Sequence, residues 1–298
     1  MIQEDLAKAA IKKIGTLGSL AEASASKPQY KNSIKKILIN QGYNIDLKIL
    51  QDHKITIELA SDDYLESLFT DYFFGASRIS SQIENITNLI NSNSQPAWVI
   101  ISTYYASFFM ANEISKLCGS YIINFSSEEF KALLFHARNT IPATLNIEPN
   151  NSFKVTVSPS SFADHVLLTL TKSSPRPHVE VWKNLSSIIK NLDVNDKIKQ
   201  HQTLYLNICS EQESAWKLPS AIRNEWNYTY ADFFGVKGTE LARKFLQLMS
   251  SYSSSISWAS NRTLKPHEEN IVASMAYIYY VLKEATYIIN ERLLKKEE

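Results

Sequence analysis

The segment of the chain best equipped for chemistry is residues 218–232, where Arg223 is followed directly by Asn224. Tyr228 stands five places after the arginine, and Tyr230 follows two places later. A guanidinium is a planar, permanently charged fork that matches phosphate oxygens, and an amide can orient a phosphate or a base. Phenolic hydroxyls both donate and accept hydrogen bonds. Together these groups could bind a phosphate-bearing ligand and stabilise negative charge that develops on it.

A second group of hydrogen-bonding aromatic residues lies upstream, where Tyr104 and Tyr105 occur within the apolar segment 97–117. A buried tyrosine stabilises a fold when its hydroxyl finds a partner, so packing in the core is the first interpretation of this pair. The second is that the two rings shape a pocket around Arg223. The segment 223–230 has three interpretations: hydrogen bonding that ties helices together, a contact for RNA or a nucleotide, or a catalytic site.

The segments Tyr104–Ala111 and Arg223–Tyr230, in this order and each in a helical context, resemble the HEPN superfamily (higher eukaryotes and prokaryotes nucleotide-binding). The resemblance covers residues 63–119 and 178–296. It implies an up-down helical bundle, RNA or a nucleotide as ligand, and a homodimer in which two copies of the arginine motif face each other. Many members are metal-independent endoribonucleases of bacterial toxin–antitoxin or phage-defence systems, whereas others are non-catalytic.

The sequence departs from the family's pattern at Tyr228, which stands where the resemblance implies a catalytic histidine. In RNA cleavage without metal, the ribose 2′-hydroxyl attacks the adjacent phosphate while a base takes its proton and a cation stabilises the phosphate oxygens. Histidine titrates near pH 6.5 and tyrosine near 10, so only about one tyrosine in a thousand is ionised at pH 7. General acid–base catalysis contributes about 10²–10⁴ in rate. Arg223, Asn224 and Tyr228 are therefore the candidate catalytic residues of a nuclease that lacks the family's histidine. The alternatives are a site that binds RNA or a nucleotide without cleaving it and a segment that only ties helices together.

The resemblance also implies substrate-binding residues and partner proteins. Tyr230, Tyr104 and Tyr105 are the expected substrate-binding residues. In family members with a second tyrosine, at the position that Tyr230 matches, that tyrosine is a target for adenylylation by a partner nucleotidyltransferase. An antitoxin or another defence component is the alternative partner. The rival interpretation of the whole chain is a non-enzymatic helical scaffold in a multi-component defence complex.

Composition excludes several classes of protein. The 31 lysines and arginines balance 30 acidic residues among 298, which excludes a uniformly basic coat for nucleic acid. The seven glycines form no phosphate-binding loop, so we expect no nucleotide cofactor. Two cysteines, Cys118 and Cys209, cannot form a four-cysteine zinc site, and the six histidines lack zinc-binding spacing, so we expect free thiols and no metal. No secretory segment and no apolar run of about 20 residues occurs, which predicts a cytoplasmic protein without a membrane span.

Hydrophobic periodicity predicts a mostly α protein with a small β-containing N-terminal part and a β-containing insertion. The resemblance implies that its helices form an antiparallel up-down bundle. We expect residues 1–60 to form an N-terminal α/β leader and residues 61–298 a HEPN-like helical domain, with the insertion at about 120–176. The expected strands are a hairpin of 43–49 with 54–59, and two strands at 153–157 and 166–171. The expected helices are 3–13, 63–90, 97–117, a short capped helix at 126–136, 178–192, 196–209, 220–234, 239–252 and about 30 residues from Pro266.

Basic residues gather in only a few short runs. The segment 31–36 contains Lys31, Lys35 and Lys36 and is the best candidate for a helix face that follows RNA phosphates. A solvated surface helix is the alternative interpretation of the same lysines.

Overall fold

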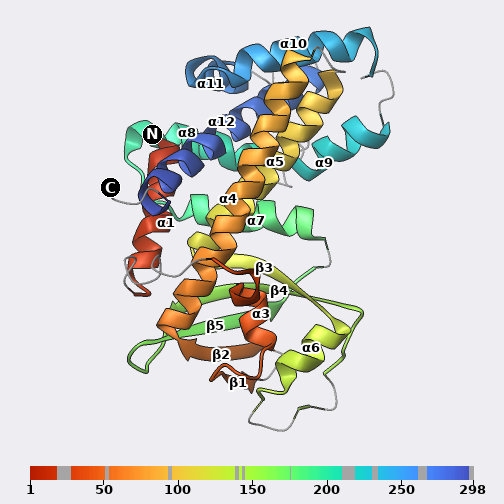
Figure 1. Ribbon diagram of the computed structural model, residues 1–298. Helices are drawn as coiled ribbons and strands as arrows, with labels where there is room; N and C mark the ends of the chain where they lie inside the picture. Colours follow the sequence, from red (N-terminus) through yellow and green to blue (C-terminus); the bar gives the residue numbers. More distant parts are fainter. Residues whose placement is uncertain are drawn as a thin grey trace. The chain divides into compact units, whose positions relative to one another are not determined.

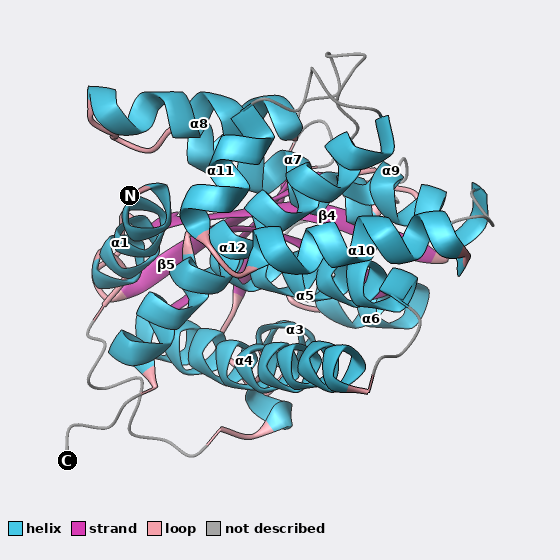
Figure 2. Cartoon of the chain, turned by 90° about the horizontal axis from the view of Figure 1, so that it is seen from above, coloured by secondary structure: helices cyan, strands magenta, loops and turns pink. Residues whose placement is uncertain are grey.

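The computed structural model describes residues 1–18, 28–50, 54–92, 96–137, 141–142, 145–174, 176–209, 219–229, 234–260 and 267–294. The chain is mostly helical, at 67%, with 11 α-helices and one five-stranded antiparallel sheet among the described residues (Figure 2). It divides into two compact units. The first comprises Met1–Lys8, Ala76–Ala111 and Val181–Arg292, and the second Ala9–Gly75, Asn112–Glu180 and Leu293–Glu298.

The sheet belongs to the second unit and has the strand order β1-β2-β5-β4-β3 (Figure 1). The expected hairpin is confirmed, because β1 (Asp46–Ile49) pairs antiparallel with β2 (Ile55–Ala60). The two expected strands of the insertion are confirmed as β4 (Asn150–Pro159) and β5 (His165–Lys172). Every pair of neighbouring strands is antiparallel.

The strands of residues 46–60 and those of residues 120–172 form one continuous sheet. Strand β2 pairs with β5 from Ile55 opposite Leu170 to Ala60 opposite His165. The edge strand β3 (Ser120–Ser126) was not among the expected strands. Its buried residues Tyr121, Ile123 and Phe125 are all apolar and occur at every second position, and this spacing in the sequence could have revealed the strand.

In the second unit, the short helix α6 (Ser127–Leu134) packs against β3 and β4, and α3 (Ile34–Ile39) packs against α6 (Figure 1). Helix α6 begins where the sequence predicts, at a capping box in which Ser126 accepts from the Glu129 backbone N–H and Glu129 accepts from the Ser126 N–H. An ion pair between Lys35 and Glu129 joins the two helices.

The two longest helices of the first half of the chain are α4 (Ser61–Asn91) and α5 (Pro96–Leu117), both close to their expected bounds. Hydroxyls inside α5 bond back along the helix: Thr103 donates to the Val99 carbonyl at 2.7 Å and Ser107 to the Thr103 carbonyl at 2.8 Å. These bonds allow polar residues to be fully buried. Within the described part of the chain, no helix is both long and apolar enough to cross a membrane.

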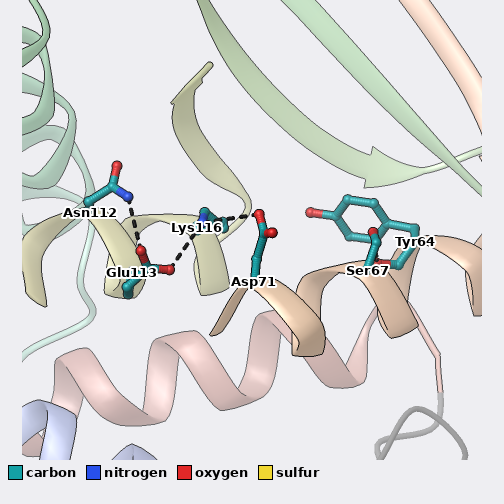
Figure 3. A network of polar contacts seen from close by, with 6 residues as sticks. All are labelled: Tyr64, Ser67, Asp71, Asn112, Glu113 and Lys116. Atoms are coloured by element: carbon teal, nitrogen blue, oxygen red, sulfur yellow. Dashed lines mark hydrogen bonds and ion pairs between the residues drawn. The ribbon is translucent and has the colours of Figure 1, made fainter. Parts of the chain in front are cut away.

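A buried ionic network joins α4 and α5 within the second unit (Figure 3). The Lys116 ammonium contacts the Asp71 carboxylate at 3.2 Å and the Glu113 carboxylate at 3.0 Å, and Asn112 donates to Glu113 at 3.2 Å. The Lys116, Asp71 and Glu113 side chains are only 13%, 19% and 3% exposed. Gly75 makes room for the network, because a Cβ there would lie 2.5 Å from Cδ of Glu113.

The remaining helices differ from the sequence expectation in two places. The described part of the expected helix 220–234 is a short α-helix, Pro219–Asn224, followed by a π turn, Glu225–Thr229, and a further helix lies near residue 252. Helix α11 (Tyr252–Ser260) was not expected, because its run of serines gives little hydrophobic periodicity. In the last helix, Met275, Ile278 and Leu282 share one face at helical spacing and are fully buried. The other helices are α1 (Ile2–Gly15), α7 (Pro177–Lys190), α8 (Asp196–Ile208), α10 (Val236–Met249) and α12 (His267–Leu293).

Both cysteines are free thiols: Cys209 is buried, and Cys118 keeps some exposure. Burial raises the pKa of each thiol to about 12. The thiolate is the reactive form, so we expect both cysteines of the folded protein to react with a thiol reagent at pH 8 about a thousandfold more slowly than free cysteine. Mass-spectrometric alkylation rates in buffer and in urea would check this. Fast labelling of either residue before unfolding would contradict the burial described here.

Candidate functional site

The arginine segment lies in the first unit at a change in helix type. Helix α9 (Pro219–Asn224) begins with a proline, whose fixed φ suits the first helical turn. It is followed at once by a π-helical turn, η3 (Glu225–Thr229). In an α-helix, residues five apart lie about 140° apart around the axis. The wider π turn reduces this angle, which brings Tyr228 toward the side of the helix that carries Arg223.

The Arg223 guanidinium is braced by its neighbour in the chain. Its Nε and Nη2 atoms both donate to the Oδ1 atom of Asn224, at 3.1 and 2.6 Å. Arg223 is half-buried and Asn224 is exposed. The amide oxygen fixes the orientation of the fork without neutralising it, because it carries no net charge.

Arg223 has no carboxylate partner among the residues that the structure describes; the ion pairs found there involve other cations. A guanidinium has five N–H donors, and the bonds to Asn224 use only two of them. The remaining donors are suited to an anion with several oxygens, such as a phosphate.

Tyr104 of α5 lies close to this cation and inside an aromatic cluster. Its ring is 1% exposed and lies 5.4 Å from Tyr105, 6.4 Å from Phe108 and 6.2 Å from Trp182 of α7, centroid to centroid. Burial raises the pKa of the Tyr104 hydroxyl to about 12, and the charge of Arg223 offsets part of that rise. The Trp182 indole N–H also lowers the pKa of Tyr104, although its position falls outside the geometry of a hydrogen bond.

The structure therefore brings together some of the residues singled out in the sequence. Arg223 is hydrogen-bonded to Asn224 and acts electrostatically on the Tyr104 hydroxyl, and Tyr105 contacts Tyr104 while remaining half-buried. Tyr228 is 78% exposed, and its side chain is accessible to a large ligand. Tyr230, the residue that the resemblance connects with adenylylation, lies outside the described residues.

Three residues of this region were not identified from the sequence. Trp182 lies against Tyr104 and is fully buried, and it belongs to a stripe with Val181, Leu185 and Ile189 that could have been identified as a core face. Glu225 and Trp226 lie within the segment Arg223–Tyr230, directly after Asn224, and are 7% and 1% exposed. Their burial anchors the π turn in the first unit, so that Arg223 and Tyr228 on either side of them stay accessible.

This arrangement can bind and polarise an anion. Arg223 offers directed positive charge, and the exposed Tyr228 hydroxyl offers a proton or a hydrogen bond. Among the described residues, no group of three or more His, Cys, Asp or Glu side chains could hold a metal ion. Comparisons of the chain with protein-family models, with curated proteins and with solved structures find no match.

Proposed function

We propose that the protein is a HEPN-like RNA-binding protein of a bacterial toxin–antitoxin or phage-defence system, with a weak metal-independent endoribonuclease activity at Arg223. One observation carries the proposal: a half-buried arginine, oriented by Asn224 and without a carboxylate partner among the described residues, lies within electrostatic range of the buried Tyr104 hydroxyl. These are the two segments on which the resemblance rests, and they are 119 positions apart in the chain. A shared site requires the two segments to lie close together in the fold. Two segments that match the family only by coincidence could lie anywhere in it.

In the proposed reaction, the ribose 2′-oxygen forms a bond to the adjacent phosphorus and the 5′-oxygen of the next nucleotide leaves. Arg223 stabilises the charge that builds on the non-bridging oxygens, and Asn224 keeps the guanidinium in place. Tyr228 donates its proton to the departing 5′-oxygen. Water takes the proton of the 2′-hydroxyl. Because water is a much weaker base than histidine, the reaction is slow.

The proposal includes the finer architecture that the resemblance implies. The helices of the first unit form an antiparallel up-down bundle, and two copies of the chain pair so that their Arg223 motifs face each other. The protein acts in the cytoplasm, in reducing conditions that suit its two free thiols. Its activity is controlled by an antitoxin, by a nucleotidyltransferase that modifies Tyr230, or by another defence component.

A non-enzymatic scaffold is the second candidate function. The observation in its favour is that a tyrosine, Tyr228, stands where the resemblance implies a histidine, since tyrosine as a residue type is a weak acid–base catalyst at neutral pH. In this alternative, Arg223 holds RNA or a nucleotide without cleaving it, and the chain contributes binding to a larger defence complex.

We expect the purified protein to cleave total RNA or tRNA in EDTA, and Arg223→Ala to lower the rate about 10²- to 10³-fold, because it removes the group that stabilises the phosphate charge. Arg223→Lys should retain part of the activity, since it keeps the charge but loses the fork. The measurement is the rate of fragment formation on denaturing gels, with circular dichroism to verify folding.

Arg243→Ala is the matched control, because Arg243 is an exposed arginine on α10 of the same unit. Its rate should equal that of the wild type. Cleavage that is unchanged in Arg223→Ala would reject the assignment of the site. RNA binding that depends on Arg223 without any cleavage would favour the scaffold.

A further inference from the structure

The second unit exposes three aromatic rings close together, on the 3₁₀ turn η1 (Tyr30–Asn32) and on α4. Tyr30 is 68% exposed, Phe73 42% and Phe74 41%. The Tyr30 and Phe74 rings lie edge-to-face at 6.4 Å, and Phe73 and Phe74 at 5.7 Å. We call these three residues the aromatic surface. A contiguous group of exposed rings is uncommon on a soluble protein and marks a binding site more often than a lone exposed residue does.

The position of the aromatic surface follows from what the other side of α4 must bury. Tyr72 is 1% exposed, and Gly75 lies against the Glu113 carboxylate of the buried ionic network. Because successive helical residues turn by about 100°, fixing positions 72 and 75 in the interior turns 73 and 74 outward. These phenylalanines are therefore held in place by a rigid helix and do not fill the core.

Positive charge borders the aromatic surface. The Lys36 ammonium lies 5.9 Å from the centroid of the Tyr30 ring, and Lys31 next to Tyr30 is exposed. The acidic side chain that η1 contacts, Glu66, is oriented by a hydrogen bond from the Asn32 amide at 2.8 Å and keeps its negative charge. Lys35 is paired with Glu129, so Lys31 and Lys36 are the lysines of segment 31–36 that remain for an anionic ligand.

We propose that the aromatic surface binds single-stranded RNA, with bases stacking on Tyr30 and Phe74 and the backbone phosphates contacting Lys31 and Lys36. Flat, exposed rings beside ammonium groups match a ligand that carries both planar bases and regularly spaced negative charge. An apolar protein segment would use the rings but leave the lysines without a counter-charge. This surface lies apart from the Arg223 motif in the chain, so the inference stands independently of the nuclease activity.

The test is a binding titration of the full chain with a fluorescein-labelled 2′-O-methyl oligouridylate of about 12 nucleotides, followed by fluorescence anisotropy. The 2′-O-methyl group removes the nucleophile, so binding is measured without cleavage. We expect Phe74→Ala and Tyr30→Ala each to weaken binding about tenfold, and Tyr30→Phe to bind like the wild type. Lys36→Gln should reduce the slope of log affinity against log salt by about 0.7.

Phe162→Ala is the matched control, because Phe162 is a phenylalanine of the same unit that is 61% exposed and lies outside the aromatic surface. It should leave binding unchanged. All these positions are at the surface, so circular dichroism and thermal unfolding should match the wild type.

Three results would overturn the inference. The first is a wild-type protein that binds no oligouridylate, and the second is binding that Phe74→Ala, Tyr30→Ala and Lys36→Gln all leave unchanged. The third is a change of oligomeric mass in the aromatic-surface variants, measured by light scattering, with RNA affinity unaltered; that would assign the surface to a protein contact. Arg223→Ala, titrated in parallel and assayed for cleavage, decides the proposed function separately.

Discussion

Tyr228→His should cleave RNA about 10²- to 10⁴-fold faster than the wild type in EDTA, because it supplies the acid–base group that the motif lacks. Imidazole titrates near pH 6.5, so both its protonated and its neutral form are present at neutral pH. Tyr228 is 78% exposed, and its replacement disturbs no packing. The new histidine would stand on the π turn that follows Arg223, five positions along the chain. The rate should also acquire a dependence on pH close to 6.5.

Two companion variants make this result specific. Tyr287→His introduces a histidine at another exposed tyrosine of the first unit, 59% exposed, and should leave the rate unchanged. Combining Tyr228→His with Arg223→Ala should abolish most of the gain, since the phosphate charge would lose its cation. An unchanged rate in Tyr228→His, with RNA binding intact, would argue that the chain is a scaffold.

Lys116→Met should lower the free energy of unfolding by about 3–5 kcal/mol, because it leaves the Asp71 and Glu113 carboxylates buried without their counter-charge. The three side chains are between 3% and 19% exposed, which separates this network from a surface ion pair (Figure 3). Methionine keeps most of the volume of lysine, so the loss reports the charge. Urea unfolding at pH 7, followed by circular dichroism, is the measurement.

Lys172→Met is the matched control for that experiment. Its ion pair with Glu148 has side chains that are 51% and 39% exposed, and pairs of this kind contribute less than about 1 kcal/mol. Equal destabilisation by the two variants would show that the Lys116 network is no more important than a surface contact.

The effect of Lys116 should also depend on pH. Burial lowers the pKa of the Lys116 ammonium, but the Glu113 and Asp71 carboxylates outweigh that effect and hold it above the ordinary value of 10.5. A group whose pKa is raised by folding stabilises the protein fully below its unfolded pKa and loses that contribution as the pH rises through the folded pKa. The difference in stability between the wild type and Lys116→Met should therefore become smaller above pH 10.5.

Most elements could be predicted from the sequence because their signals are local. Ser126 and Glu129 form the capping box that starts α6, and alternating apolar residues revealed the β1–β2 hairpin. The pairing of β2 with β5 could not be predicted, since it depends on contacts between segments that are far apart in the chain. Single-sequence patterns carry no information about which strand lies beside which.

In the candidate site, too, the residues with local sequence signals were predicted and those that depend on packing were missed. Arg223, Asn224 and Tyr228 were identified by residue type and spacing, which are local properties. The contribution of Trp182 was missed, because its place beside Tyr104 is set by packing between two helices. The two residues are 78 positions apart in the chain. The π turn at Glu225–Thr229 was also missed, since an α-helix and a π turn share the same residue preferences over so short a stretch.

The pairing of β2 with β5 has a consequence for synthesis of the protein. Strand β2 ends at Ala60 and its partner β5 begins at His165. The edge of β2 that pairs with β5 therefore stays unpaired while roughly a hundred residues are translated, which takes about 5–20 s at ordinary rates. During that time the hairpin of β1 and β2 offers unsatisfied backbone groups and the apolar side chains of Ile55, Ile57 and Leu59. Nascent chains stalled before residue 165 should therefore be chaperone substrates, and overexpression should be limited by their aggregation rather than by the stability of the finished fold.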